Sequence, residues 1–409
     1  MIPNEKTYLT LSEEGYLKRV SIRSFQASEN TATTLKEGDR FCGVIEAETF
    51  DSILIFLHTG KYVCIPLLSI EEGKWKDLGN HIGHYVKLEG NHKVIASFLI
   101  KSFDSEVDII LATEKGLIKR SPLKAFEVNR TNKSYEAISL MAQDRVVACF
   151  EAYDESDILV SSAEGYAALY KKEDIPLVQV KSKGVKALNL SKGDRLASAC
   201  ALYDDKAAIC VVSMNGQMKR LKRSDFEFSN RPAKGELLAR KVKTNPIFVD
   251  KLIPVFAYDR LQITQEPQNN LLVKDIPFMD KSSSYSNGMK DIVNAYLVLG
   301  IKEIKIVDLL KKNPVEFEKK PHSDEASELI LKVGSANLPK EVLEDDHSNT
   351  STNATSLTLG TTTNGNFEIA GDMDYFKVDL VAGKKYLFQM NDLTLGIGEA
   401  DRKRVLERV

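Results

Sequence analysis

Apolar and polar positions follow one repeated order along the first three quarters of the chain. Short apolar runs rich in Val, Ile, Leu and Ala are bounded by polar turns, and they occur at 52–57, 107–112, 157–162 and 207–213. Runs of this length with turn residues at both ends predict strands that are buried between sheets. A turn that contains glycine follows each run, which predicts a hairpin into a second strand.

The predicted second strand carries a basic pair and ends at an aromatic residue. The clearest copies hold Lys18-Arg19, Lys119-Arg120 and Lys219-Arg220, and their aromatic residues are Phe25, Phe126 and Phe226. Weaker copies follow Gly60 and Gly165, and a sixth at 269–274 lacks the glycine. The glycines at 15, 60, 116, 165 and 216 are separated by 45, 56, 49 and 51 residues. Self-similarity at this period is typical of bladed β-structures.

Each unit continues with a loop, an amphipathic strand and a further turn. Good copies of this half lie at 34–44, 86–96, 135–148 and 184–199. A unit therefore contains about four short strands, which is one blade of a propeller. Six such units fit residues 6–312, so the sequence predicts an all-β fold: a six-bladed, propeller-like β-pinwheel over 1–312, followed by a small C-terminal β-module.

The character of the chain changes after Lys312. Residues 313–343 are acidic and contain prolines, which predicts a linker with one short helix near 326–332. Residues 344–395 include alternating segments and predict the small β-module. The final stretch, 396–409, predicts a charged helical tail.

Total charge identifies no partner, because 56 basic residues face 58 acidic ones in a chain of 409. The distribution is more informative, since residues 201–250 hold ten Lys and Arg against six Asp and Glu. A local basic surface on a near-neutral body is compatible with polyanion binding. The alternative is that these lysines only solvate strand faces.

The five cysteines lie in or beside apolar runs and form no CxxC pair. This pattern predicts buried, reduced thiols in a cytoplasmic protein and neither a disulfide framework nor a zinc site. The N-terminal residues contain no apolar signal region, and no run approaches the ~18 apolar residues of a membrane span. We therefore expect a soluble chain with no membrane partner.

The repeated unit resembles the C-terminal β-pinwheel of bacterial type IIA topoisomerase A subunits, those of DNA gyrase and topoisomerase IV. The matching residues are the three basic pairs, the Gly38-Asp39 and Gly193-Asp194 turns, and the segment 183–188. The resemblance covers about 5–312. It implies a DNA-binding and DNA-bending domain that supports changes in DNA topology. It also implies a nucleoid-associated location and, as partners, duplex DNA, the topoisomerase N-terminal A region and the B subunit.

The chain also departs from that family's pattern. The gyrase A subunit carries a glycine- and arginine-rich box in its first blade, and here the corresponding residues, 25–33, contain none. The resemblance therefore favours the topoisomerase IV type. The breakage–reunion region with its active tyrosine does not occur in this sequence, so we expect no catalytic residues and no DNA cleavage by this chain alone. The resemblance implies no cofactor.

The tail is similar to a different module, the bacterial pre-peptidase C-terminal (PPC) domain, cut short after Met390. The similarity rests on Asp345-Asp346-His347 and on residues 371–386. If the tail folds in that way, Asp345, Asp346, Asp372 and Asp374 are weak calcium candidates, although carboxylates in turns are usually only solvated. We otherwise expect no metal site.

The expected DNA contacts are phosphate contacts on a basic outer rim. Neighbouring side chains of a strand face opposite ways, so at least one residue of each basic pair is expected to face outward. The candidates are Lys18, Arg19, Arg23, Lys119, Arg120, Lys124, Lys183, Lys186, Lys219, Arg220, Lys222, Arg223, Arg231, Lys234, Arg240 and Lys241. The strand after Gly165 carries Ala167-Ala168 in place of a basic pair, and it is expected to contribute least.

Two other functions stay open at this point. A propeller can act as a protein-interaction platform without binding DNA, and salt-dependent DNA affinity would separate the two. A secreted adhesive protein is suggested only by the tail. The recurring Phe25, Phe126 and Phe226 are expected to pack blades together, although stacking on bases is conceivable.

Overall fold

The computed structural model describes residues 3–28, 31–203, 207–241, 246–256, 259–266 and 268–304, and beyond these only a set of strands. The chain divides into two compact units, residues 1–304 and 305–409. The regular structure of the described residues consists of strands and single-turn helices, so the prediction of an all-β fold is confirmed.

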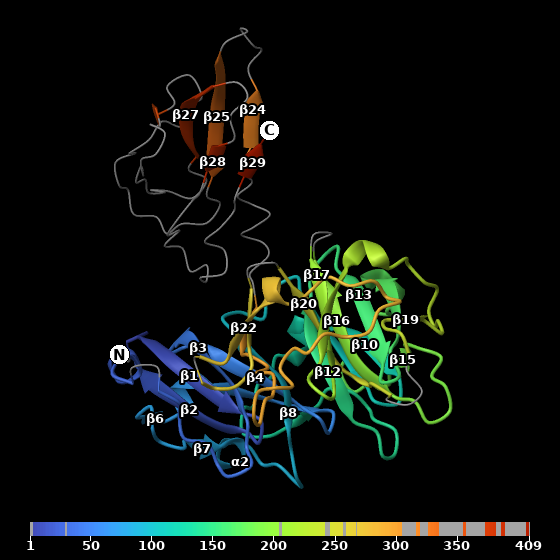
Figure 1. The fold of residues 1–409 in the computed structure, drawn as a ribbon. Helices are drawn as coiled ribbons and strands as arrows, with labels where there is room; N and C mark the ends of the chain where they lie inside the picture. The colour runs from blue at the N-terminus through green and yellow to red at the C-terminus, as the bar shows by residue number, and fades with distance from the viewer. Residues whose placement is uncertain are drawn as a thin grey trace. The chain divides into compact units, whose positions relative to one another are not determined.

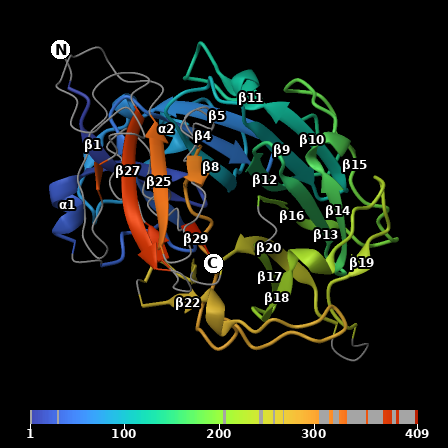
Figure 2. The same cartoon turned by 90° about the horizontal axis from the view of Figure 1, so that it is seen from above.

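Five sheets, which we call blades 1 to 5, repeat one topology in the first unit, and each is built on three antiparallel strands (Figures 1 and 2). The central strands are β1 (Lys6–Ser12), β4 (Ser52–Leu57), β9 (Asp108–Thr113), β13 (Asp157–Ser162) and β17 (Ala208–Ser213). On one side they pair with the hairpin strands β2 (Tyr16–Ser21), β5 (Lys61–Pro66), β10 (Leu117–Pro122), β14 (Tyr166–Lys171) and β18 (Met218–Lys222). On the other side they pair with β3 (Phe41–Glu48), β8 (Val94–Ile100), β12 (Val146–Ala152), β16 (Leu196–Leu202) and β20 (Val249–Val255).

A single helical turn follows each hairpin strand and places the recurring anchor. These turns are α1 (Ile22–Gln26), η1 (Leu67–Ser69), η2 (Leu123–Phe126), η3 (Lys172–Asp174) and η4 (Arg223–Asp225). Phe126 and Phe226 are buried, and Phe25 stacks on Tyr8 with ring centroids 3.9 Å apart. The expectation that these aromatic residues are packing anchors is therefore confirmed.

The fourth strand of a blade comes from the segment that follows the next blade's anchor. Short strands β6 (Glu72–Gly73) and β7 (Asn80–His81) pair with β2. In the same way β11 (Tyr135–Glu136) pairs with β5, β15 (Val185–Lys186) with β10, and β19 (Glu236–Leu237) with β14. Figure 2 shows β11, β15 and β19 following one another around the outside of the ring. This exchange joins consecutive blades by backbone hydrogen bonds.

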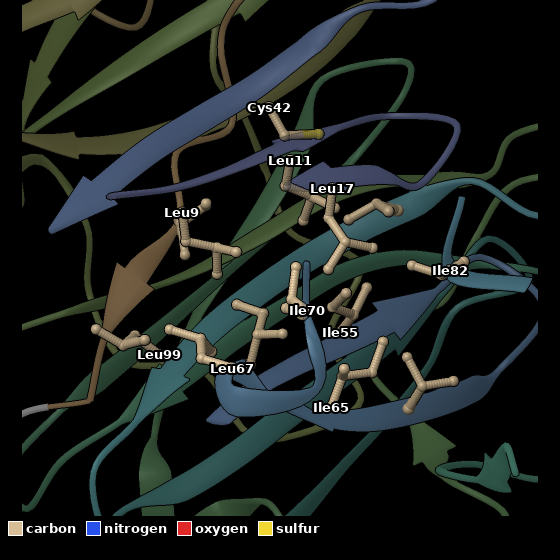
Figure 3. Packing of buried hydrophobic residues seen from close by; sticks show 14 of the residues in the cluster. Leu9, Leu11, Leu17, Cys42, Ile55, Ile65, Leu67, Ile70, Ile82 and Leu99 are labelled. Atoms are coloured by element: carbon tan, nitrogen blue, oxygen red, sulfur yellow. The ribbon is translucent and has the colours of Figure 1, made fainter. Parts of the chain in front are cut away.

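The hydrophobic core lies between blades. In Figure 3, Leu9, Leu11 and Leu17 of blade 1 face Ile55 and Ile65 of blade 2. The central strands of blades 2 to 5 are buried on both faces along nearly their whole length, as expected where both faces of a sheet are covered. Every residue of 53–57 is fully buried, for example. All five cysteines are buried and free, as the sequence predicted.

A shorter hairpin and a closing segment complete the described ring. The hairpin consists of β21 (Arg260–Gln262) and β22 (Asn270–Leu272), followed by η5 (Val273–Asp275). The backbone of 296–298 bonds to this hairpin, and β23 (Lys302–Glu303) then pairs with β8 of blade 2. The hairpin occupies the place of the predicted sixth blade, and the number of six complete blades stays a prediction.

The second unit is described only through its strands. One sheet contains β24 (Glu316–Lys319), β25 (Ala326–Gly334), β27 (Met373–Val381) and β26 (Thr355–Ser356), and a separate pair contains β28 (Tyr386–Phe388) and β29 (Leu406–Arg408). The helix predicted near 326–332 is wrong, because this segment is β25 and pairs with β24 and β27 on its two edges. The helix predicted for 396–409 is likewise wrong at Leu406–Arg408.

Pairing explains the first of these corrections. The apolar residues Leu329, Ile330, Leu331 and Val333 have no clear strand period, and β24 and β27 bond to the two edges of this segment. The predicted calcium candidates Asp345, Asp346 and Asp372 lie outside the described residues, and Asp374 lies in β27, whose side chains are not described. The PPC-like module stays a prediction.

Candidate nucleic-acid interface

The three repeated lysines do not face solvent. Lys18, Lys119 and Lys219 are buried, although all three were predicted to lie on a basic rim. Lys119 Nζ donates hydrogen bonds to the carbonyl oxygens of Ala137 (2.7 Å) and Gln179 (3.0 Å). Lys219 Nζ donates to those of Asp280 (2.9 Å) and Ser283 (3.1 Å). The prediction that these lysines lie exposed on a basic rim is therefore wrong, because the protein's own backbone carbonyl groups take up their ammonium groups.

Lys18 repeats the same arrangement in blade 1. Its Nζ donates to the carbonyl oxygens of Trp75 and Asp77 and to the hydroxyl of Thr33. Burial lowers the pKa of Lys18, Lys119 and Lys219 to about 8 in each case, because a charged amine is costly to desolvate. The carbonyl acceptors partly offset that cost.

The arginine of each pair holds the anchor of the next blade. The Nε atoms of Arg19, Arg120 and Arg220 donate to the carbonyl oxygens of Ile70 (3.3 Å), Ile175 (3.0 Å) and Ile276 (2.5 Å). These isoleucines directly follow η1, η3 and η5 as their C-cap residues. Arg220 is buried, Arg19 and Arg120 are half-buried, and Arg120 also pairs with Asp108 at 2.9 Å. The arginine of one blade thus binds the start of the segment that follows the anchor of the next blade.

Those segments form the outer edge of the ring, and we call them the edge segments: 71–81, 127–136, 176–186, 227–237 and 277–287. Each lies against the hairpin strand of the preceding blade. Backbone hydrogen bonds join them in sequence, from Lys87 to Asn132, Ser139 to Ser182, Asn189 to Ala233 and Arg240 to Ser283. The edge segments and the residues next to them therefore form a continuous band around five blades.

A close backbone contact fixes the register of the band. At Gly184 an added Cβ would lie 2.8 Å from the carbonyl oxygen of Ile118, and at Gly235 it would lie 2.7 Å from that of Ala167. At these two positions a Cβ would collide with the backbone of the hairpin strand, so glycine allows the close approach, whereas the copy at 133–138 has Ser134 there. The residue before each glycine is consequently held at an equivalent place on the surface.

Those equivalent places carry lysines on three consecutive blades. Lys183 precedes Gly184 and Lys234 precedes Gly235, while Lys133 precedes Ser134 at the same register of the third edge segment. All three lysines are exposed. Lys234 Nζ lies 5.7 Å from the ring centroid of Tyr166, and Lys133 Nζ lies 4.8 Å from that of Tyr135. We call Lys133, Lys183 and Lys234 the lysine row.

Lys133 was missed by sequence reasoning. The segment 133–138 corresponds to 183–188, but it has serine where the other copy has Gly184, so the match was hidden. Aligning the two segments by their position after the anchor would have revealed it.

The remaining predicted residues fall into two groups. Arg23, Lys124, Lys186, Lys222, Arg240 and Lys241 are exposed, as are Lys183 and Lys234. Of these, Lys124 pairs with Asp104 and Glu127, and Lys241 pairs with Glu164. Arg223 and Arg231 are half-buried: Arg223 pairs with Asp157 at 2.6 Å, and Arg231 donates to the carbonyl oxygens of Asp174 and Lys186.

The strand after Gly165, β14, carries no basic pair. Ala167 and Ala168 are buried, so these two positions of β14 offer no side chain to a ligand. Lys171 at the end of β14 is exposed, whereas Lys172 is buried against Asp154 and Asp108. The edge segment on β14 nevertheless carries Lys234, so the basic surface of this blade comes mainly from the next stretch of chain.

Within the described residues, no group of three or more His, Cys, Asp or Glu side chains is placed to hold a metal ion. No helix in the described part of the chain has the length and apolar character of a bilayer span.

Comparison with known proteins agrees with this architecture. The family described as the DNA gyrase C-terminal domain, a β-propeller, matches residues 6–40, 108–150, 156–199 and 208–245. The A subunit of DNA topoisomerase 4 from Bacillus subtilis is 28% identical over 290 residues, and that from Staphylococcus aureus is 29% identical over 291. Each alignment covers 70% of this chain and 36% of the relative, so the chain spans about a third of the length of these curated relatives.

Solved structures give the same result for the fold. The crystal structure of the C-terminal domain of DNA topoisomerase IV superposes with a TM-score of 0.63 at 27% identity, covering 73% of this chain and 93% of that one. The DNA gyrase A C-terminal domain superposes with a TM-score of 0.56 at 20% identity, covering 72% and 98%. Through its first compact unit, the chain is therefore similar to the DNA gyrase C-terminal β-propeller domains and to the C-terminal domain of DNA topoisomerase IV.

Proposed function

We propose that this chain is a non-catalytic domain of a type IIA topoisomerase A subunit, of the topoisomerase IV type, and that it binds and bends duplex DNA on its outer edge. The single observation that carries the proposal is the lysine row, in which Lys133, Lys183 and Lys234 occupy one register on consecutive blades. The names of the relatives, DNA topoisomerase and DNA gyrase, support duplex DNA as the ligand.

The band of edge segments suits a polyanion that runs along it. Its backbone bonds join consecutive blades, so the lysine heads are spaced along one curved surface. Lys183 and Lys186, on the middle blade of the row, are exposed, and no ion pair joins either of them to a carboxylate in the described part of the chain. Such ammonium groups can exchange the counterions of a phosphate backbone for direct contacts. These contacts position DNA without reading its sequence.

The wider setting follows from the same proposal. The domain would hold DNA while a breakage–reunion region and a B subunit carry out strand passage, and the complex would act on the chromosome in the bacterial cytoplasm. No cofactor is required for phosphate binding by lysine. A protein-interaction platform without DNA binding is the alternative outcome of the test below.

The test measures the affinity of the full chain for a fluorescent duplex of about 40 base pairs by anisotropy at several salt concentrations. We expect the logarithm of the association constant to fall linearly with the logarithm of salt concentration. The triple variant Lys133→Gln, Lys183→Gln and Lys234→Gln should bind more weakly, and its slope should be smaller by about 2 to 3, at roughly 0.9 per lost phosphate contact.

The matched control replaces three exposed lysines outside the band. Lys6, Lys36 and Lys93 pair with Glu46, Glu14 and Glu13, and their exchange for glutamine should leave the salt slope unchanged. The proposal is wrong if the wild-type chain fails to bind the duplex at low salt, or if both triple variants lose the same affinity.

A further inference from the structure

A second row of side chains accompanies the lysine row, and these side chains are apolar. Leu177, Phe228 and Phe278 lie two residues after the anchors Ile175, Phe226 and Ile276. Each forms a parallel bridge with the outer hairpin strand of the preceding blade, opposite Arg120, Leu169 and Arg220 respectively. We call Leu177, Phe228 and Phe278 the apolar row.

These three side chains are unusually open to solvent for their type. Leu177 is 53% exposed, and Phe228 and Phe278 are each 49% exposed. Single exposed apolar residues are ordinary on a protein surface. Three at one register on consecutive blades are not explained by packing, because the buried anchor two residues earlier already fills the space between blades.

The charge around the apolar row indicates what covers it. The guanidinium of Arg223 lies 5.0 Å from the ring centroid of Phe228, and Lys171 Nζ lies 5.5 Å from the same centroid. Arg220 and Lys222 lie 4.1 and 6.0 Å from the centroid of Phe278. Of these four cations, Arg220 is buried and Arg223 pairs with Asp157, whereas Lys171 and Lys222 are exposed. An apolar protein partner would have to desolvate the two lysines, whereas a polyanion is attracted to them.

The two rows share two edge segments. Lys183 and Lys234 follow Leu177 and Phe228 by six residues in both cases, and Phe278 lies on the next edge segment. A duplex whose phosphates contact the lysine row would therefore run along the same band that carries the apolar row.

We propose that Leu177, Phe228 and Phe278 contact the minor groove of the bound duplex, and that the two phenylalanines insert partly between base steps and bend it. Apolar side chains that enter the minor groove unstack a step and kink DNA towards the major groove. Steps that unstack easily, TA and CA, would then be favoured at these positions. This inference rests on the proposed DNA binding and adds to it a source of curvature and of step preference.

The experiment compares the full chain with the double variant Phe228→Ala and Phe278→Ala. Bending is measured by energy transfer between dyes at the two ends of a duplex of about 40 base pairs, and affinity by anisotropy. We expect the variant to leave the energy transfer close to that of free DNA and to lose the preference for duplexes rich in TA steps. Affinity should fall about threefold to tenfold, while the salt slope stays unchanged because no phosphate contact is lost.

A second variant keeps the test independent of folding. Phe228→Leu with Phe278→Leu retains apolar volume, and it should keep most of the energy transfer. If the alanine variant still binds DNA with unchanged bending and step preference, the proposed contact of the apolar row with the minor groove is wrong, and the proposed phosphate contacts of the lysine row are unaffected. Failure of the wild-type chain to bind DNA would instead overturn the proposed function, and the inference with it.

Discussion

Replacing Lys119 by methionine should destabilise the protein, although lysine is the more polar residue and the site is buried. Methionine has a similar length but cannot donate a hydrogen bond. The carbonyl oxygens of Ala137 and Gln179 would therefore lose their donor. A hydrogen bond to a charged group contributes about 1.5 to 3 kcal/mol. Because Gln179 is exposed, its carbonyl can recover a bond to water. We expect a loss of about 2 to 4 kcal/mol in the free energy of unfolding.

The free energy of unfolding should also depend on pH in a way that tests this prediction. Burial lowers the pKa of Lys119 from 10.5 to about 8, so between these values the unfolded chain holds a proton that the folded chain has lost. Raising the pH through this window therefore stabilises the wild-type fold relative to the methionine variant, by up to about 1.4 kcal/mol per pH unit. The stability difference between the two proteins should be smallest near neutral pH and should widen as the pH rises above the pKa of the folded state.

The assay is urea unfolding followed by far-UV circular dichroism at about pH 7, 8.5 and 9.5, which run from below the folded-state pKa into the window between the two pKa values. The matched control is Lys183→Met, because Lys183 is exposed. That control should stay within about 0.5 kcal/mol of the wild type. The reasoning is refuted if Lys119→Met is as stable as this control, or if the stability difference narrows as the pH rises.

Three further predictions concern the edge segments and the core. Gly184→Ala should lower the melting temperature more than Gly193→Ala does, because only the first change places a Cβ against the carbonyl oxygen of Ile118. An alanine at 193 would meet open space, and its only cost would be the positive φ. Equal losses in differential scanning calorimetry would contradict this prediction. Lys183→Gln alone should reduce the salt slope of DNA binding by about 0.9, and an unchanged slope would remove Lys183 from the interface. The five buried cysteines should not react with a thiol reagent at mildly alkaline pH until the protein is unfolded, because burial raises the pKa of their thiols. Rapid labelling of the native protein would contradict the packing between blades.

Much of the fold could be predicted from sequence because each signal was local. Apolar runs of five to seven residues, glycine turns and the recurring aromatic residue after the basic strand are properties of short stretches. The turn glycines Gly15, Gly60, Gly116, Gly165 and Gly216 all have positive φ, a conformation that glycine adopts without a steric penalty. The predictions were wrong where the local pattern and the pairing of strands disagree. The segment of β25 was expected to be a helix, but it pairs with β24 and β27 and is therefore a strand.

The candidate site was less predictable, and the reason lies in the strand exchange between blades. On an isolated hairpin, Lys119 and Arg120 would both be accessible, and alternation along a strand says only that they face opposite ways. In the folded chain a segment 60 residues further on, around Gln179, covers the strand and takes up the lysine as its own hydrogen-bond donor.

The sequence by itself therefore determined the repeat, the all-β architecture, the buried thiols and the packing anchors, since these depend on the periodicity and turn chemistry of nearby residues. The tertiary structure decided which cations meet solvent. It moved the expected contact surface from the repeated Lys-Arg pairs to the edge segments, because the fourth strand of each blade is supplied by the next stretch of chain. A buried ammonium must then find carbonyl acceptors, and the lysines that remain exposed along the band are those that the edge segments carry.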